Sequence, residues 1–134
     1  MELTFNSNHT EGIHIYLTDN TLQYWLHFTS FQKQWRGMVL SHSKVITKSE
    51  KKQLQNEFNL FDDLYMRFLT YLTNDLQAYN NMFLPAKFVQ AIENEFDDFI
   101  VYCKENNDLD LLEITADFKL IFRRNLITPQ NLTH

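Results

Sequence analysis

The chain has 134 residues and a formal net charge of −5, with 44% hydrophobic and 22% charged residues. This length and composition are typical of one globular domain and exclude an intrinsically disordered chain. Only two glycines are present, which excludes the glycine-rich loops that bind phosphate in nucleotide-binding folds. We therefore expect a single domain over residues 1–134, and we expect no cofactor.

The aromatic content of the chain is high, with 12 Phe, 6 Tyr and 2 Trp making up 15% of the residues. These rings bury large apolar areas and supply a core of adequate size. Some of them must still reach the surface, where aromatic side chains are concentrated in binding hot spots. The composition is thus a first indication of a partner protein.

The compartment is indicated by the single cysteine and by the N-terminal residues. Cys103 permits no internal disulfide, which suits a reducing environment. The first residues lack the basic and apolar regions of a signal peptide. No apolar run approaches the roughly 18–20 residues that span a bilayer. We expect a cytoplasmic protein that does not associate with membranes.

Charge is distributed unevenly along the chain. Residues 57–117 hold 13 of the 17 acidic residues and three basic ones, whereas residues 33–52 hold six of the 12 basic residues and one acidic one. Such an acidic body repels phosphate, so we do not expect nucleic acid to be the partner. A basic protein is the better match for this part of the chain.

The first predicted elements are strands. Apolar and polar residues alternate over 13–17 and again over 22–28, as in half-buried strands. A helix over 20–36 that ends at Gly37 is the rival interpretation of the second segment. Residues 38–46 are expected to be extended.

Two long amphipathic helices are predicted next. Thr47 and Glu50 have the spacing of a capping box, and apolar residues then recur every three or four positions over about 48–82. Pro85 suits the first turn of a second helix, over about 85–106. Asparagines and Asp108 end that helix.

The last predicted element is a strand over 112–122, where apolar and polar residues alternate almost regularly. A helix is the rival interpretation, but it gives Ile114 and Leu120 poor positions. The predicted fold class is therefore α+β, with a small antiparallel sheet of N- and C-terminal strands packed on the two long helices. An all-α bundle is the alternative.

Four carboxylates in the second helix are the strongest local feature: Glu93, Glu95, Asp97 and Asp98. Glu93 and Asp97 are four residues apart, so a continuous helix places them on one face. Such a face is complementary to a basic protein. The alternative is an acidic helix face that is merely solvated.

Trp25 and Trp35 belong to an aromatic cluster, over residues 24–35, whose rings cannot all point inward. We interpret the two tryptophans as anchors for a partner protein. The alternatives are a core edge with one or two exposed rings and, because basic residues are interleaved, stacking on single-stranded nucleic acid.

No motif of an established catalytic type is present. Arg36 and His42 have the Arg-x5-His spacing of HEPN-type ribonucleases, but Gly37 follows the arginine where that family usually has a polar residue, and we do not assign the chain to that family. A metal-independent nuclease that uses His27, Arg36 and His42 remains an alternative function. No metal site is expected, because no histidine lies between His42 and His134.

These observations favour a small acidic intracellular binding protein over an enzyme. We expect it to inhibit or neutralise a basic partner protein, as an immunity protein, an antitoxin or a phage-encoded inhibitor does. The acidic helix face would steer the partner and the tryptophans would anchor it. The first alternative is an accessory subunit or secretion chaperone with an aromatic interface. The oligomeric state is left open.

Overall fold

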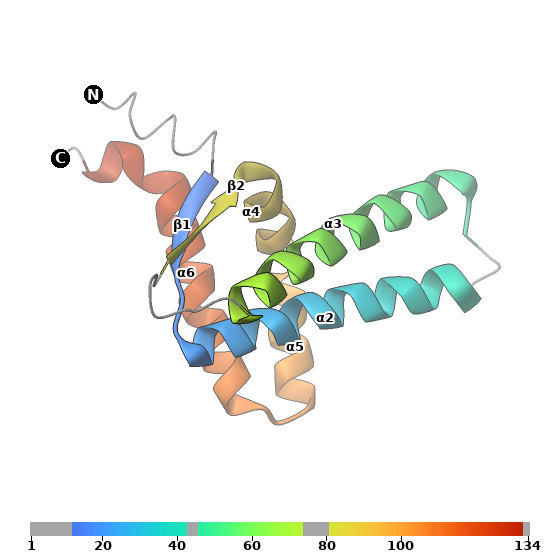
Figure 1. Ribbon diagram of the computed structural model, residues 1–134, viewed down its shortest axis with the longest axis horizontal. Helices are drawn as coiled ribbons and strands as arrows, with labels where there is room; N and C mark the ends of the chain where they lie inside the picture. Colours follow the sequence, from blue (N-terminus) through green and yellow to red (C-terminus); the bar gives the residue numbers. More distant parts are fainter. Residues whose placement is uncertain (1–11, 43–45, 74–80, 133–134) are drawn as a thin grey trace. The chain divides into compact units, whose positions relative to one another are not determined.

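The computed structural model describes residues 12–42, 46–73 and 81–132. Within these ranges the protein has two strands and five helices, which confirms the α+β class and makes it mostly helical (Figure 1). None of the described helices is both long and apolar enough to cross a membrane. The elements, in chain order, are β1 (Gly12–Tyr16), α2 (Asp19–His42), α3 (Lys48–Thr73), β2 (Asn81–Pro85), α4 (Ala86–Glu93), α5 (Phe96–Glu105) and α6 (Leu109–Leu132).

The chain divides into two compact units. One unit contains β1, β2, α4, α5 and α6, and the other contains α2 and α3. The expected single domain over residues 1–134 stays a prediction.

The sheet is a two-stranded antiparallel ribbon of β1 and β2. Ile13 pairs with Leu84 and Ile15 with Met82, and all four side chains are buried. The prediction of a strand near the N-terminus is confirmed. The predicted pairing of this strand is wrong, because β1 pairs with residues 81–85 and not with a C-terminal strand.

The prediction of a strand over 22–28 is wrong, because this segment belongs to α2. The buried residues follow each other at spacings of three and four, which is the period of a helix: Trp25, Phe28, Gln32 and Arg36. The last two lie beyond the segment that was predicted as a strand. Over only seven residues, the apolar pattern fits both a strand and a helix. The pattern of buried residues over the whole of α2 distinguishes the two.

The start and course of α2 differ from both interpretations of the sequence. Thr18 and Thr21 exchange hydrogen bonds, since each hydroxyl accepts from the other's backbone N–H (3.1 Å and 2.7 Å). The helix continues through Gly37 to His42, so residues 38–42 are not extended. A Cβ at Gly37 would lie 3.3 Å from Cε2 of Phe58, which explains a glycine inside a helix at this close approach to α3.

The predicted capping box at the start of α3 is confirmed. Thr47 N–H donates to Glu50 Oε1 (3.0 Å), and Glu50 N–H donates to Thr47 Oγ1 (3.1 Å). Hydrogen bonding of the Glu50 carboxylate to the backbone and the side chain of Thr47 favours the ionised form and lowers the pKa of Glu50. The helix is shorter than predicted: of its expected last residues, 74–80 lie outside the described ranges, and 81–82 belong to β2. Helices α2 and α3 lie side by side (Figure 1).

The predicted helix over 85–106 is interrupted at Asn94 and Glu95, which divide it into α4 and α5. At the interruption, Glu95 N–H donates to the oxygen of Ile92, three residues back (2.9 Å). The predicted end of the helix is confirmed. Asn107 has a φ of 54°, and the amide of Asp108 donates to Cys103 O (2.9 Å), as in a Schellman motif.

The prediction of a strand over 112–122 is wrong, because these residues belong to α6. Thr115, Phe118 and Phe122 are buried at spacings of three and four. Asp108 caps this helix by accepting a hydrogen bond from the amide of Leu111 (3.1 Å). Helices α5 and α6 pack against each other and are joined by residues 106–108, which makes them a helical hairpin.

Candidate protein-binding surface

The α5–α6 hairpin exposes large apolar side chains to solvent. Val101 of α5 is 52% exposed, and Leu109 and Leu120 of α6 are 70% and 57% exposed. Ala116, which is also exposed, lies seven residues after Leu109 and four before Leu120. These spacings place the three α6 residues on one side of the helix. The exposed Glu113, four residues after Leu109 and three before Ala116, lies on the same side. The hairpin thus carries an apolar strip outside the core.

Both helices of the hairpin turn their exposed residues to a common side. Phe99 and Cys103 of α5 and Phe118 of α6 are buried, so the opposite faces point away from the core. An ion pair between Asp97 and Lys119 joins the two helices. Val101 lies one turn after Asp97, on the same face of α5. We call this side, with the exposed residues of 97–105 and 109–123, the outer face of the hairpin.

The outer face is framed by carboxylates. Asp98 and Glu105 are exposed on α5, seven residues apart, and Asp110 and Asp117 are exposed on α6, also seven apart. Over residues 96–123 there are seven acidic and three basic residues. Two turns of helix separate the members of each pair, so a row of negative charge lines each edge of the apolar strip.

The four acidic residues singled out from the sequence are not on one helix face. Glu93 ends α4, Glu95 lies in the interruption, and only Asp97 and Asp98 are in α5. Asp97 and Asp98 lie in the first turn of α5. Negative charge is favourable there because the N-terminus of a helix is the positive end of its dipole. The structure therefore gives these two aspartates a local role that the continuous helix of the prediction did not offer.

Basic residues of α6 partly neutralise the predicted acidic patch. The hydrogen bond and charge of Lys119 lower the pKa of Asp97. Burial raises the pKa of the half-buried Glu93, and the charge of Arg123 acts in the opposite direction. Asp98 is exposed, whereas Glu95 is half-buried. Of the four predicted residues, Asp98 and Asp97 belong to the outer face.

The prediction that Trp25 anchors a partner protein is wrong, because its side chain is completely buried. Its ring stacks on Phe68 of α3 at 5.6 Å between centroids and makes an edge contact with Phe28. Trp35 is half-buried, and its indole N–H donates to Oε1 of Gln32 (3.2 Å). The structure thus gives both tryptophans roles in packing the α2–α3 unit.

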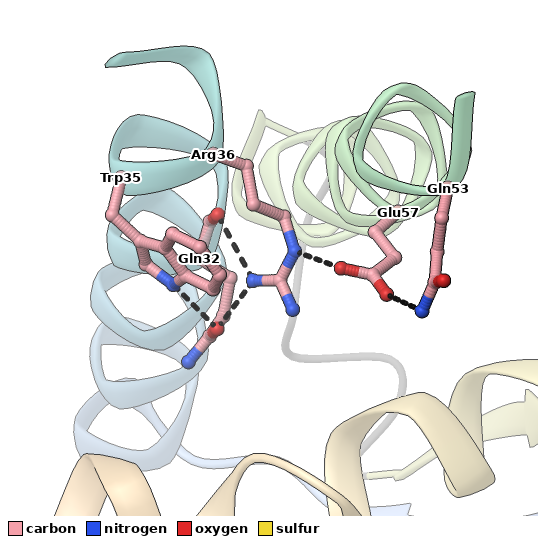
Figure 2. Close-up of polar contacts among 5 residues, drawn as sticks. All are labelled: Gln32, Trp35, Arg36, Gln53 and Glu57. Atoms are coloured by element: carbon pink, nitrogen blue, oxygen red, sulfur yellow. Dashed lines mark hydrogen bonds and ion pairs between the residues drawn. The ribbon is translucent and has the colours of Figure 1, made fainter. Parts of the chain in front are cut away.

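Arg36 is the centre of a polar network between α2 and α3 (Figure 2). Its side chain is 3% exposed, and its Nε donates to Glu57 Oε1 at 2.8 Å. Its Nη1 donates to Gln32 Oε1 (2.8 Å), and the guanidinium lies 4.2 Å from the centroid of the Trp35 ring. Gln53 donates to the second oxygen of Glu57 (3.1 Å).

This network bears on the alternative of a nuclease. The segment 36–42 is helical, although the sequence did not read as helix there. His27 and His42 are exposed, but Arg36 is buried and bonded to Glu57, so its guanidinium is not presented to a phosphate group. Among the described residues, no three His, Cys, Asp or Glu side chains gather in a way that could hold a metal ion.

Exposed aromatic rings occur on the outward side of the β1–β2 ribbon. His14 and Phe83 are cross-strand partners, with ring centroids 5.0 Å apart. Tyr16 is 61% exposed on the same side of β1. This ribbon surface, defined by His14, Tyr16 and Phe83, is a second place where a partner could bind.

Sequence reasoning missed the α6 half of the outer face because it read α6 as a strand. The signal was present: a helix over these residues left Leu120 in a poor position, and the structure shows that position to be exposed. An apolar residue that disturbs a helical pattern thus marked a surface residue.

Comparisons with protein families, with curated proteins and with solved structures found no match for this chain.

Proposed function

We propose that this protein is a small acidic binding protein that inhibits or neutralises a basic partner protein, and that the outer face of the α5–α6 hairpin is its binding surface. The observation that carries the proposal is the set of exposed apolar residues Val101, Leu109 and Leu120, with Glu113 among them and a row of carboxylates on each side. Apolar side chains supply the buried centre of an interface, and charge at its rim selects and steers the partner.

The charge of the face argues for a basic partner. Lys119 is paired with Asp97, and Arg123 lies near Glu93, which leaves Lys104 as the remaining cation over residues 96–123. The exposed carboxylates therefore dominate the potential of this face. Such a potential attracts a basic protein and repels phosphate, so nucleic acid does not fit as the partner.

The experiment is affinity capture from the producing cell, followed by reconstitution with the purified partner. We expect a basic protein in stoichiometric amount, with an activity that falls when the chain is added. Asp98→Asn with Asp117→Asn should weaken binding and flatten its dependence on ionic strength. Asp62→Asn with Asp63→Asn, on α3, removes the same charge and should bind as the wild type does. Because this control also breaks the ion pairs of Asp62 with Lys33 and of Asp63 with Arg67, its fold is checked by circular dichroism.

A Tyr16→Ser, Phe83→Ser variant decides between the two candidate surfaces. If this variant loses binding and the α5–α6 variants keep it, the partner binds the β1–β2 ribbon, and the assignment to the outer face is wrong. If no protein is captured at low or at physiological ionic strength, the proposed function itself is contradicted.

A further inference from the structure

We propose that the element bound at the outer face is a basic amphipathic helix of the partner, about three turns long. This inference rests on the proposed function and specifies which part of a basic partner is recognised. It starts from the periodicity of the exposed apolar residues. Leu109, Ala116 and Leu120 follow the spacing of one helix face, which also carries the exposed Glu113, and Val101 is exposed on the neighbouring helix α5.

The dimensions of the outer face fit a helix. From Leu109 to Leu120 is three turns, or about 16 Å at 1.5 Å per residue. Two packed helices present a surface against which a third helix can pack an apolar stripe. The exposed residues of the hairpin offer no strand edge to which an extended segment could add.

The charges of the face specify the flanks of the bound helix. Asp98 and Glu105 line one edge of the apolar strip, and Asp110 and Asp117 line the other. A helix with apolar residues in its centre and Lys or Arg on both sides would meet a carboxylate at every second turn. The long side chain of a flanking Lys or Arg can also reach Glu113, within the strip. Basic flanks on only one side would leave one row of carboxylates without a partner.

Other occupants fit this surface less well. A second copy of the chain would bring the same carboxylate rows against each other, and like charges across an interface are unfavourable. Anionic lipid headgroups would be repelled for the same reason. A basic helix is the occupant that satisfies both the apolar strip and the two rows.

The test uses the full chain and two synthetic peptides of Leu and Lys with the same composition, about 14 residues long so that helix can form. In the stripe peptide, leucines recur every three or four residues and lysines flank them. In the scrambled peptide, the leucines are spread around the helix. Affinities are measured by calorimetric titration, and the bound residues are mapped from amide chemical shifts.

We expect the stripe peptide to bind at least about tenfold more tightly than the scrambled one, a difference that titration resolves readily. Shifts should concentrate on the outer face. Leu109→Ser with Leu120→Ser should abolish the difference, and because both leucines are exposed, the circular dichroism of the variant should be unchanged. The double substitution Asp98→Asn with Asp117→Asn should lower the affinity of the protein for both peptides.

Equal binding of the two peptides, or stripe binding that survives the two serine substitutions, would overturn the helical occupant while leaving a basic partner in place. Failure of both peptides to bind, at low ionic strength, would contradict the basic partner as well. The two failures are therefore distinguishable.

Discussion

Arg36 and Glu57 form an ion pair in which the arginine is buried and the glutamate is partly exposed. The arginine side chain is 3% exposed and lies among Trp35 and Phe61, whereas the glutamate is 33% exposed. A buried charge without its partner costs much more than an exposed one, because water cannot solvate it. The two halves of this pair should therefore respond differently to mutation.

We expect Glu57→Ala to lower the free energy of unfolding by about 3 kcal/mol, because it leaves a buried guanidinium without its carboxylate. Arg36→Met should cost only about 1 kcal/mol, since methionine fits apolar surroundings and Glu57 can hydrate. Urea unfolding measures both. Gln53→Ala, at an exposed residue of the same network, is the control. A larger loss for Arg36→Met would show that the arginine stabilises mainly through packing.

The ion pair of Asp97 with Lys119 predicts a pH dependence of the hairpin. The folded pKa of Asp97 is lowered from 3.8, so the unfolded chain takes up the proton first as the pH falls. The contribution of the pair is complete above 3.8 and is lost as the pH falls through the lowered folded value.

Asp97→Asn should therefore unfold with a flatter pH dependence below about 4 than the wild type, the range in which aspartate titrates. Thermal unfolding at a series of pH values measures this difference. Glu93→Gln should act in the opposite direction, because the raised pKa of Glu93 makes its protonation favour the folded state. Parallel curves for the wild type and Asp97→Asn would show that the pair is too exposed to matter.

At the scale of the elements, the turn between α5 and α6 depends on one backbone conformation. Asn107 has a φ of 54°, in the left-handed region that glycine adopts without strain and β-branched residues avoid. Asn107→Gly should leave the free energy of unfolding unchanged or slightly raised, whereas Asn107→Val should lower it by about 1–2 kcal/mol. Chemical denaturation of the two variants measures this difference. Equal free energies of unfolding for Asn107→Gly and Asn107→Val would mean that the turn can rearrange.

Local signals predicted the elements that depend on local chemistry. The capping box of Thr47 and Glu50 and the stop at Asn106–Asp108 were found because each involves neighbouring residues. The ribbon of β1 was found from its alternation, but its partner strand was not, because pairing joins residues about 70 positions apart along the chain.

Two segments were misread for different physical reasons. The apolar pattern of residues 22–28 fits the period of a strand and that of a helix. The helical pattern continues through Gln32 and Arg36, which are buried, but polar residues are not expected in a core from the sequence. Residues 112–122 were misread because Leu120 is apolar and exposed. Of the candidate site, Asp97 and Asp98 were foreseen and the α6 half was not.

At the scale of the whole molecule, the acidic rows have a second consequence for the exposed apolar strip. Val101, Leu109 and Leu120 would promote self-association if nothing opposed it, since exposed apolar patches attract one another. The carboxylates around them oppose it, because two copies would bring like charges together. Solubility of the free protein and recognition of a basic partner would then depend on the same residues.

We therefore expect the wild-type chain to sediment as a monomer at an ionic strength of about 0.15 M. A variant that combines Asp98→Asn, Glu105→Gln, Asp110→Asn and Asp117→Asn with Glu113→Gln, within the strip, should form dimers or larger species, because charge no longer opposes the association of its apolar residues. Adding Leu109→Ser and Leu120→Ser to that variant should restore the monomer. If the neutralised variant stays monomeric, the strip is too small to drive association, and the energy of partner binding must come from charge or from the aromatic side of the ribbon.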